Sequence, residues 1–486
     1  MAETGTTTRR QFLHFNGTAA IAGCAGVNLG VCSSAAASGF DRDPHWNRMP
    51  HPPVHASGPN GAVISGYCAP AFRPVFDAFV ANFNTRGEIG ASIGMTFKGA
   101  PVLEAWGGWA DTFAATHSVP WNRDTVSVVF SCTKGATALA AHTLIARGLL
   151  DLDKPVAFYW PEFAVNGKSA ITVRMVMQHA AGLAAIPFTS PVPMGGWADW
   201  ATMTSLIAGM APWWEPGTAH GYHAMTFGWL VGELVRRVTS ISIGQYFADT
   251  IATPLGLDFW IGAPAHVLPR VSPMLTNPDP PGGDPFTAKM IGDPASMQSA
   301  VFFNMGGWFG LPPATPPAYN SRASLQAQIP AAGGVTNGRG LATMYAALAN
   351  GGALGSTRLL PTGYAEQVGA IHSALPIDRT VLMKTRFGYG FHGSIDNRNV
   401  GPGQSVILGV SAFGHAGFGG SIGFADPTEQ LSLGYTMNRM GAGSGLNERG
   451  QSLVDAAYRV LGYTSNKYGF WTRAGRADGF PRRDTD

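Results

Sequence analysis

A serine and a lysine three residues apart could together supply a nucleophile and its base. Ser131 and Lys134 lie in the segment VVFSCTKGATALAAHTLIARGLL, and no other lysine of the chain has a serine three positions before it. Residues at positions i and i+3 share one face of a helix, so the amine can reach the hydroxyl. A lysine whose pKa is lowered by burial or by nearby positive charge can accept the serine proton. A surface lysine after a helix-starting serine gives the same pattern, so further residues must support this interpretation.

Two later segments offer the additional polar groups that such a serine needs. Tyr222 precedes the apolar helical pattern MTFGWLVGELVRRV, a position from which a hydroxyl can point into a cleft. His415, in FGHAGF, lies between two strand patterns, and the small residues around it let the backbone approach a ligand closely. Taken singly, a half-buried tyrosine and a structural histidine are the commoner explanations. The functional prediction therefore depends on the whole set.

The composition is that of a globular protein with a large core. The 486 residues are 45% hydrophobic and 13% charged, the opposite of a disordered chain. At ~150 residues per domain, this length is typical of two or three domains. A formal net charge of +3 with no basic run argues against nucleic-acid binding. Of four cysteines, only Cys68 and Cys132 lie beyond the N-terminal segment, too few for a disulfide framework. We expect Cys132 to be a small buried residue.

The first 37 residues resemble an export signal. Arg9-Arg10 in TRRQFL is similar to a twin-arginine motif. The segment after it is too weakly apolar for a membrane span, which favours a signal cleaved near Ala37. Ile21-Ala22-Gly23-Cys24 also resembles a lipoprotein box, so the alternative is acylation of Cys24 and attachment to a membrane. In either case we expect an exported protein of the periplasm, the cell envelope or the extracellular space.

Strand patterns at both ends of the chain flank a helical middle. Residues 70–85 repeat apolar side chains at helical spacing, and the segment GASIGMTFKGAPVLEAWGGWAD predicts two strands about a turn. Residues 338–352 predict a helix stopped by glycine. Strand patterns return from about residue 386, and a closing helix follows at 446–461. The simplest fold is α+β: one antiparallel sheet formed by both ends and flanked by helices, with an inserted, mainly helical domain.

The same patterns give the expected domain boundaries. Residues 38–60 are rich in proline and histidine and read as a linker, and residues 265–320 form a long irregular excursion. The predicted parts are an export signal at 1–37, a linker at 38–60, a globular domain at 61–470 (an α/β part at about 61–125 and 370–470, a helical part at about 126–369) and a polar tail at 471–486.

Taken together, the motifs resemble those of β-lactamase-related serine hydrolases, and within them the family VIII-type carboxylesterases, over roughly residues 60–465. The family's S-x-x-K matches Ser131–Lys134. Its Y-x-N matches Tyr222-His223-Ala224, with alanine in place of asparagine. Its K-T-G or H-x-G matches His415-Ala416-Gly417, in the expected order. The resemblance implies a β-lactamase/penicillin-binding-protein-like fold that uses no cofactor and no metal.

The resemblance also implies a role for each residue. Ser131 would carry the acyl group, and Lys134 and Tyr222 would jointly accept its proton, with the choice of base left open. Tyr222 would then activate water for deacylation. The backbone N–H groups of Ser131 and Phe418 would bind the oxyanion. His415 and Gly417 would line the pocket, with His415 polarising the tyrosine or the substrate.

Departures from the lactamase pattern indicate the substrate. The asparagine of the second motif and the lysine of the third, which would bind the lactam amide and carboxylate, are replaced by Ala224 and His415. We therefore expect an esterase that hydrolyses small-molecule carboxylic esters. The enzymatic alternatives are a β-lactamase, a D-amino-acid peptidase or an acyltransferase. A non-catalytic ligand-binding relative is a further alternative, but such a protein would not need Ser131, Lys134 and Tyr222 together. Four aromatic residues are candidates for an acyl pocket: Trp213, Trp214, Phe303 and Trp308.

Two G-x-S-x-G sequences offer a competing serine. They are Gly90–Gly94, around Ser92, and Gly419–Gly423, around Ser421. In α/β-hydrolases this pattern needs a strand before it, a helix after it and a histidine later in the chain. Strand patterns follow both serines, and no histidine follows Ser421. We predict that both sequences are parts of a sheet and not nucleophile elbows.

Overall fold

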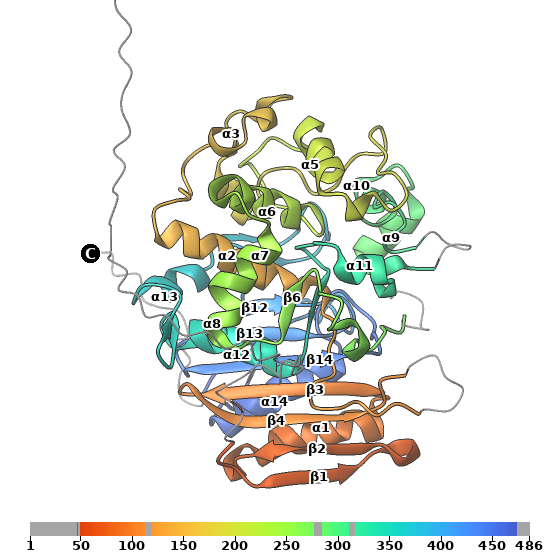
Figure 1. The fold of residues 1–486 in the computed structure, drawn as a ribbon, viewed down its shortest axis with the longest axis vertical. Coiled ribbons are helices and arrows are strands. Elements are labelled where there is room, and N and C mark those ends of the chain that lie inside the picture. The colour runs from red at the N-terminus through yellow and green to blue at the C-terminus, as the bar shows by residue number, and fades with distance from the viewer. Residues whose placement is uncertain (1–45, 47–48, 112–117, 277–283, 311–315, 474–486) are drawn as a thin grey trace, which may run out of the picture. The chain divides into compact units, whose positions relative to one another are not determined.

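A seven-stranded antiparallel sheet joins the two ends of the chain. The computed structural model describes residues 46, 49–111, 118–276, 284–310 and 316–473. Its large sheet has the order β1-β2-β4-β3-β14-β13-β12 (Figure 1). β3 pairs with β14, which places Met95 opposite Leu433 and confirms the predicted pairing of the chain ends. The strands are β1 (Pro53–Ser57), β2 (Val63–Cys68), β3 (Gly90–Phe97), β4 (Ala100–Gly108), β12 (Phe413–Ala416), β13 (Ile422–Asp426) and β14 (Leu431–Met437).

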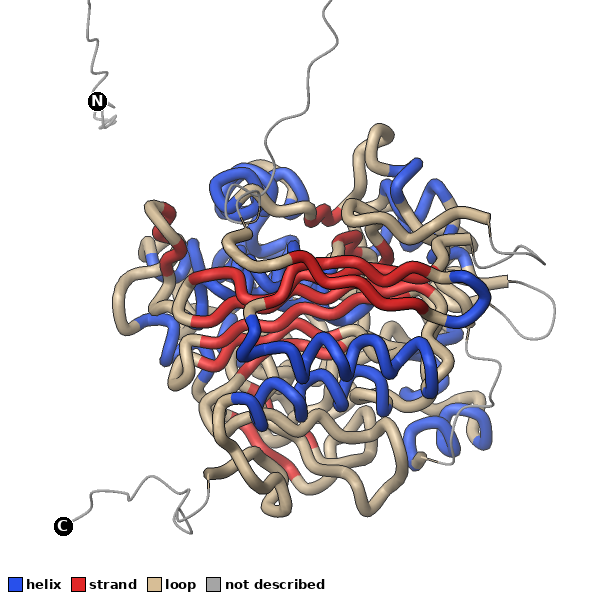
Figure 2. Tube along the Cα trace, turned by 90° about the horizontal axis from the view of Figure 1, so that it is seen from below, coloured by secondary structure: helices blue, strands red, loops and turns tan. Residues whose placement is uncertain are grey.

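Helices cover both faces of this sheet. Figure 2 shows two helices side by side along one face, where α1 (Arg73–Thr85) packs against α14 (Glu448–Val460). On the other face α12 (Gly338–Ala349) packs against β3, β13 and β14. All three helices fall where the apolar spacing predicted them.

Glycines of the sheet allow α12 to approach closely. A Cβ atom at Gly94 would lie 2.8 Å from the carbonyl oxygen of Gly338, and one at Gly434 would lie 2.3 Å from the same oxygen. Real Cβ atoms do not approach backbone this closely, so these positions need glycine. Gly94 belongs to the first G-x-S-x-G sequence, whose glycine thus serves helix–sheet packing.

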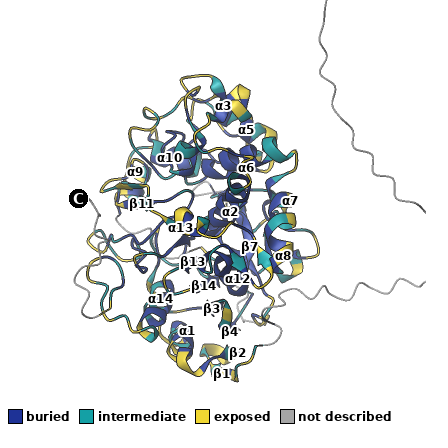
Figure 3. Cartoon of the chain, turned by 90° about the vertical axis from the view of Figure 1, so that its left-hand side faces the viewer, coloured by how far each residue is buried: buried dark blue, intermediate teal, exposed yellow. Residues whose placement is uncertain are grey.

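The middle of the chain is mainly helical and carries the small sheet β5-β7-β6 beside the S-x-x-K segment. Its central helix α2 is buried on all sides, as Figure 3 shows in dark blue. The α-helices of this part are α2 (Thr133–Ala146), α3 (Val156–Tyr159), α4 (Val173–Met177), α5 (Trp200–Gly209), α6 (Thr226–Thr239), α7 (Ile243–Phe247), α8 (Thr253–Leu255), α9 (Pro285–Gly292), α10 (Met297–Phe303), α11 (Arg322–Gln326) and α13 (Tyr364–Gly369). The short strands are β5 (Ser127–Val128), β6 (Phe259–Ile261), β7 (Gly334–Thr336), β8 (Ala353–Leu354), β9 (Thr357–Arg358), β10 (Ser373–Leu375) and β11 (Thr385–Phe387).

Three predicted boundaries are wrong. The predicted linker at 38–60 contains strand β1, which lies at the edge of the sheet. Only Val54 of this strand is buried, so its sequence has no alternation of apolar residues from which a strand could have been predicted. The tail from residue 471 begins with Trp471, which is buried and donates its backbone N–H to Leu408. The helical part at 126–369 includes α12, which belongs to the large sheet by packing.

The N-terminal predictions lie outside the described residues. This applies to the twin-arginine motif, to cleavage near Ala37 and to acylation of Cys24, which all stay predictions. Within the described part of the chain, every helix is too short or too polar to cross a membrane.

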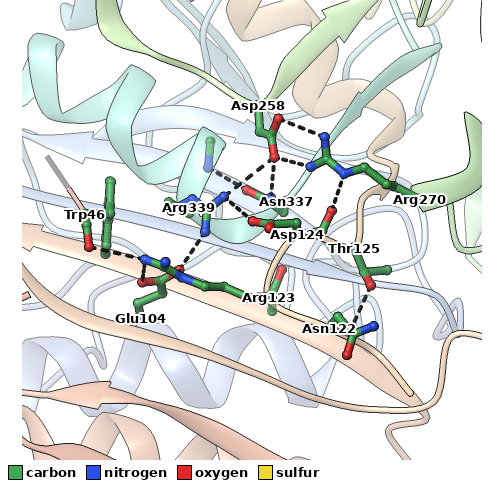
Figure 4. A network of polar contacts seen from close by, with 12 residues as sticks. Trp46, Glu104, Asn122, Arg123, Asp124, Thr125, Asp258, Arg270, Asn337 and Arg339 are labelled. Atoms are coloured by element: carbon green, nitrogen blue, oxygen red, sulfur yellow. Dashed lines mark hydrogen bonds and ion pairs between the residues drawn. The ribbon is translucent and has the colours of Figure 1, made fainter. Parts of the chain in front are cut away.

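A buried ion network ties the start of α12 to β4 and to the segment that leads into α2 (Figure 4). The guanidinium of Arg339 contacts the carboxylates of Glu104 and Asp124 at 2.8 Å each and that of Asp258 at 3.6 Å. Arg123 makes a second pair with Glu104 at 2.8 Å. Arg339, Glu104 and Asp258 are nearly inaccessible to solvent, so each charge depends on its partners.

We expect Arg339→Met to lower the free energy of unfolding by about 3 kcal/mol, because it leaves buried carboxylates with one cation fewer. Urea titration of the purified variant measures this loss. The matched control is Arg73→Met, which removes an exposed pair with Asp77 at 2.8 Å and should change stability by less than about 1 kcal/mol. Equal losses in the two variants would contradict the importance of this network.

Candidate active site

Ser131 lies in a tight turn directly before α2. Residues Phe130–Cys132 form one turn of 3-10 helix, so the serine precedes the α-helix that carries Lys134. Phe130 has a φ of 42°, in the left-handed region that non-glycine residues seldom occupy. Its ring is held by edge contacts with Trp308 and Tyr319, at centroid distances of 6.0 and 5.3 Å. This packing fixes the turn that presents the serine.

The structure brings Ser131 and Lys134 together. Lys134 Nζ lies 3.1 Å from Ser131 Oγ, 2.6 Å from the carbonyl oxygen of Ala224 and 2.9 Å from that of Ala331. The lysine is fully buried. Burial disfavours its charged form and lowers its pKa well below 10.5.

A neutral lysine amine has two N–H bonds and one lone pair. Lys134 Nζ donates to the carbonyl oxygens of Ala224 and Ala331, and its third contact is with the hydroxyl of Ser131. When the amine is neutral, its two N–H bonds can stay on the carbonyls, and its lone pair is then available to the hydroxyl proton of Ser131.

Tyr222 completes a cluster with these two residues. Its hydroxyl interacts with Ser131, and its ring centroid lies 4.8 Å from Lys134 Nζ. The ring is stacked on Phe387 with centroids 5.9 Å apart and an interplanar angle of 8°. Desolvation raises the pKa of Tyr222 above 10, so the phenol keeps its proton near neutral pH.

Asp378 anchors Tyr222, and the sequence did not point to it. The backbone N–H of Tyr222 donates to both carboxylate oxygens of Asp378, at 3.1 and 3.0 Å. The same carboxylate accepts the N–H groups of Thr380 and Val381 and the hydroxyl of Thr385. Burial raises the pKa of Asp378 to about 6, against hydrogen bonds that lower it. Its segment, PIDRT, has no motif or periodicity that would have indicated this role.

His415 faces Tyr222 with its ring centroid 6.0 Å away. Its Nδ1 lies 3.1 Å from the carbonyl oxygen of Ala416, so Nδ1 carries the proton. Its Nε2 is buried without a hydrogen-bond partner in the described part of the chain. Burial lowers the pKa of His415 well below 6.5, so the ring is neutral. Cys132 is fully buried as predicted, with Sγ 3.1 Å from the carbonyl oxygen of His415.

The end of β12 lies against the serine turn. A Cβ atom at Gly417 would lie 2.3 Å from the carbonyl oxygen of Val129, so this close approach requires glycine. The next residue, Phe418, makes an edge contact with Phe130 at 5.9 Å. Among the described residues, no backbone hydrogen bond uses the N–H of Ser131 or of Phe418.

A cavity of about 340 Å³ opens over the cluster and is lined by Ser131, Tyr222, His415 and Phe418. The aromatic residues of its wall are Phe130, Phe286, Phe302, Phe309, Tyr319, Phe387 and Phe418.

The four aromatic residues expected to line an acyl pocket do not line this cavity. Trp213 and Trp308 instead donate their indole N–H groups to Ala185 and Ser324. Three of its aromatic residues, Phe286, Phe302 and Phe309, come from α9, α10 and the following loop. These lie within the excursion at 265–320, where the sequence indicated only irregular structure.

The serines of the two G-x-S-x-G sequences lie away from this cavity. Ser92 is buried in β3 and pairs with Thr436 at 3.0 Å, while also accepting the N–H of Gly338. Ser421 is buried directly before β13. The prediction is confirmed for Gly90–Gly94, which lies within β3. In the second sequence only Ile422 and Gly423 belong to β13, and Gly419–Ser421 lie in the turn before it, but here too a strand and not a helix follows the serine.

Comparison with known proteins identifies the family. A profile of the family described as Beta-lactamase matches residues 76–458, well over half of the chain. The chain belongs to the β-lactamase family. The Esterase/beta-lactamase LipL of Mycobacterium tuberculosis is 35% identical over 388 residues, which cover 79% of this chain and 85% of LipL.

Solved structures agree with this assignment. A family VIII carboxylesterase is 37% identical, has a TM-score of 0.70, and is matched over 82% of this chain and 100% of that chain. A penicillin-binding-protein homologue from Caulobacter crescentus is 33% identical with a TM-score of 0.70, over 82% of this chain and 100% of that chain. The predicted family, the predicted α+β fold and the prediction of a serine hydrolase are confirmed.

Proposed function

We propose that this β-lactamase-family protein is an esterase that hydrolyses small-molecule carboxylic esters through an acyl-enzyme on Ser131. The observation that carries the proposal is the contact set of the buried Lys134 amine, which lies 3.1 Å from Ser131 Oγ and is held by the carbonyl oxygens of Ala224 and Ala331. A lysine with these contacts acts as a base toward that hydroxyl.

The first half of the reaction forms the acyl-enzyme. Ser131 Oγ attacks the ester carbonyl carbon while its proton passes to the Lys134–Tyr222 pair. The backbone N–H groups of Ser131 and Phe418, which no protein group engages among the described residues, stabilise the oxyanion. The ester C–O bond then breaks, and the departing alcohol takes the proton from the pair.

The second half reverses the proton movement. Water enters where the alcohol left, gives a proton to the Lys134–Tyr222 pair and attacks the acyl carbon. The bond to Ser131 Oγ breaks, the serine regains its proton, and the acid leaves. The neutral His415 offers its Nε2 lone pair to a hydroxyl or water at this side of the cavity.

Several features favour esters over β-lactams. Ala224 presents a methyl group where the family's second motif has asparagine, and His415 is neutral where the third motif has lysine. The cavity wall is mainly apolar and includes several aromatic rings, which suits an apolar acyl group. Names of the similar proteins include both esterase and β-lactamase, so the two activities must be compared directly.

Fluorophosphonate labelling tests the nucleophile. We expect a single phosphonylated peptide containing Ser131 and no label on Ser131→Ala. Label on Ser92 or Ser421 would contradict the proposal. On the unlabelled enzyme, we expect kcat/KM for 4-nitrophenyl butanoate to exceed that for a chromogenic cephalosporin by at least about 100-fold, since each missing polar contact costs roughly tenfold. The reverse ranking would assign lactam hydrolysis instead.

We also propose that the enzyme acts outside the cytoplasm, on the basis of Arg9-Arg10 and the weakly apolar segment after them. Fractionation of cells that express the full chain tests this, with Arg9→Lys/Arg10→Lys as the comparison. Loss of the exported form in that variant is the expected result. Metabolic labelling with a fatty acid tests the lipoprotein alternative, in which Cys24 would carry the label.

A further inference from the structure

The cavity has two chemically different sides. One is an aromatic wall, defined here as Phe130, Phe302, Phe309 and Phe418. Their rings form a continuous series, with centroid distances of 4.2 Å for Phe302–Phe309, 5.8 Å for Phe302–Phe418 and 5.9 Å for Phe130–Phe418. The wall therefore starts at the proposed oxyanion donor, Phe418, and continues along α10. An apolar group of the substrate gains burial there.

The other side is a polar edge, defined here as Lys384, Asn397 and Gln404, which all line the same cavity. Asn397 and Gln404 are only 4% and 5% exposed. The Nδ2 of Asn397 donates to the carbonyl oxygens of Lys384 and Gln404, at 3.0 and 3.2 Å. The Oε1 of Gln404 accepts the N–H and the hydroxyl of Ser444, at 3.2 and 2.8 Å. These bonds fix the orientation of both amides.

Each amide keeps one atom without a protein partner among the described residues. It is the acceptor Oδ1 of Asn397 and the donor Nε2 of Gln404. Lys384 adds an exposed ammonium group, and the nearby carboxylate of Asp396 is already paired with Arg398 at 2.7 Å. Both atoms belong to residues that line the cavity, and neither is among the fully buried atoms without a partner, so both are open to a bound group. A group that both donates and accepts hydrogen bonds can satisfy the two atoms together.

The polar edge adjoins residues that hold Tyr222. Lys384 directly precedes Thr385, whose hydroxyl binds Asp378, the anchor of Tyr222. Strand β11 also carries Phe387, on which the Tyr222 ring is stacked. In the proposed mechanism the departing alcohol takes its proton from the Lys134–Tyr222 pair, so we assign the alcohol to the polar edge and the acyl group to the aromatic wall.

We propose that the substrates are esters of an apolar acid with a polyhydroxylated alcohol, whose hydroxyls bind Lys384, Asn397 and Gln404. The proposal rests on the esterase function proposed above. Hydroxyls match the polar edge because each one donates to an acceptor such as Oδ1 and accepts from a donor such as Nε2. A carboxylate would face the oxygen of Asn397, and a plain alkyl alcohol would offer no hydrogen bond to Oδ1 of Asn397 or Nε2 of Gln404.

The test compares two esters that differ only in hydroxyl groups, glyceryl 3-phenylpropanoate and propyl 3-phenylpropanoate. Their ratio of kcat/KM is divided by their ratio of alkaline hydrolysis rates, which removes the difference in chemical reactivity. We expect a corrected preference of at least about tenfold for the glyceryl ester, since unpaired polar groups reject the analogue that lacks them. A corrected ratio near one would overturn the proposal.

Gln404→Glu is the matched variant, because it keeps the oxygen that holds Ser444 and replaces only the donor Nε2. We expect it, like Lys384→Met, to reduce the corrected preference about fivefold, the loss of one hydrogen bond. Lys467→Met, at an exposed lysine outside the cavity, should leave the preference unchanged. Equal losses on both esters would overturn the proposal.

Binding to Ser131→Ala separates this proposal from the esterase proposal, because it requires no turnover. Calorimetry should show tighter binding of the glyceryl ester than of the propyl ester, and Gln404→Glu in the Ser131→Ala background should remove the difference. If no ester is hydrolysed but this difference is present, the esterase function fails and the polyol site stands. Equal binding of the two esters overturns the polyol site.

Discussion

Replacing Lys134 by methionine is expected to lower kcat/KM for an aryl ester by about 10⁴-fold, the scale of losing a base that acts as a unit with its nucleophile. The physical reason is that Lys134 Nζ is 3.1 Å from Ser131 Oγ and is the amine that can accept its proton. Steady-state hydrolysis of 4-nitrophenyl butanoate measures the loss, and fluorophosphonate labelling of Ser131 should slow in parallel.

Lys168 provides the control for this substitution. It is also completely buried, and its amine donates to the carbonyl oxygens of Val165, at 2.9 Å, and Met210. It lies outside the catalytic cavity. Lys168→Met should therefore keep kcat/KM within about threefold of wild type, although both variants lose a buried amine. A comparable loss of activity in the two variants would show that packing, and not proton transfer, explains the effect of Lys134→Met.

The lowered pKa of Lys134 gives a pH dependence of known sign. The neutral amine is the active form, so kcat/KM should rise with pH through the pKa of Lys134, which lies well below 10.5. The unfolded chain holds this proton up to about pH 10.4. Between the two pKa values the unfolded state binds more protons, so the free energy of unfolding should rise with pH. Lys134→Met should lack this contribution, and urea titrations at two pH values in that range measure it.

Replacing Tyr222 by phenylalanine is expected to lower kcat by about 10³-fold, within the range of general acid–base catalysis. The hydroxyl interacts with Ser131, and the proposed mechanism needs it to pass protons to the leaving alcohol and from water. Phenylalanine retains the ring that stacks on Phe387, so the free energy of unfolding should change little. Stopped-flow assays and urea titrations measure these two quantities.

Asp378→Asn tests how much of the role of Tyr222 depends on the position of its hydroxyl, because this variant keeps the hydroxyl and disturbs only its support. The amide keeps the size of the carboxylate but turns one acceptor into a donor that faces the backbone N–H of Tyr222. The hydroxyl remains, so kcat should fall only about tenfold, by misplacement. Mass spectrometry should find Ser131 still acylated in both variants after long incubation. A loss in Asp378→Asn as large as in Tyr222→Phe would place Asp378 within the proton-transfer group itself.

The sequence by itself indicated the proposed catalytic pair and determined the frame of the fold. Ser131 and Lys134 lie within one helical turn of each other, so their spacing alone implies contact. The sequences of β3 and β14 are rich in apolar residues, as expected for buried strands. Those of α1, α12 and α14 repeat apolar residues at helical spacing. The local patterns were therefore enough to predict both the sheet and the helices that cover it. Tyr222 and His415 could be proposed because each carries a family motif.

Only the tertiary structure showed what surrounds these residues. The two carbonyls that hold Lys134 belong to Ala224 and Ala331. Any residue type can supply a backbone carbonyl, so the sequence could not indicate these contacts. Asp378 reaches Tyr222 across 156 positions of the chain, from a segment without periodicity. Two of the four residues of the aromatic wall, Phe302 and Phe309, come from an excursion whose proline and glycine content predicted irregular structure. Local sequence patterns report short-range geometry, whereas burial, and with it the pKa of Lys134, depends on distant segments that only folding brings together.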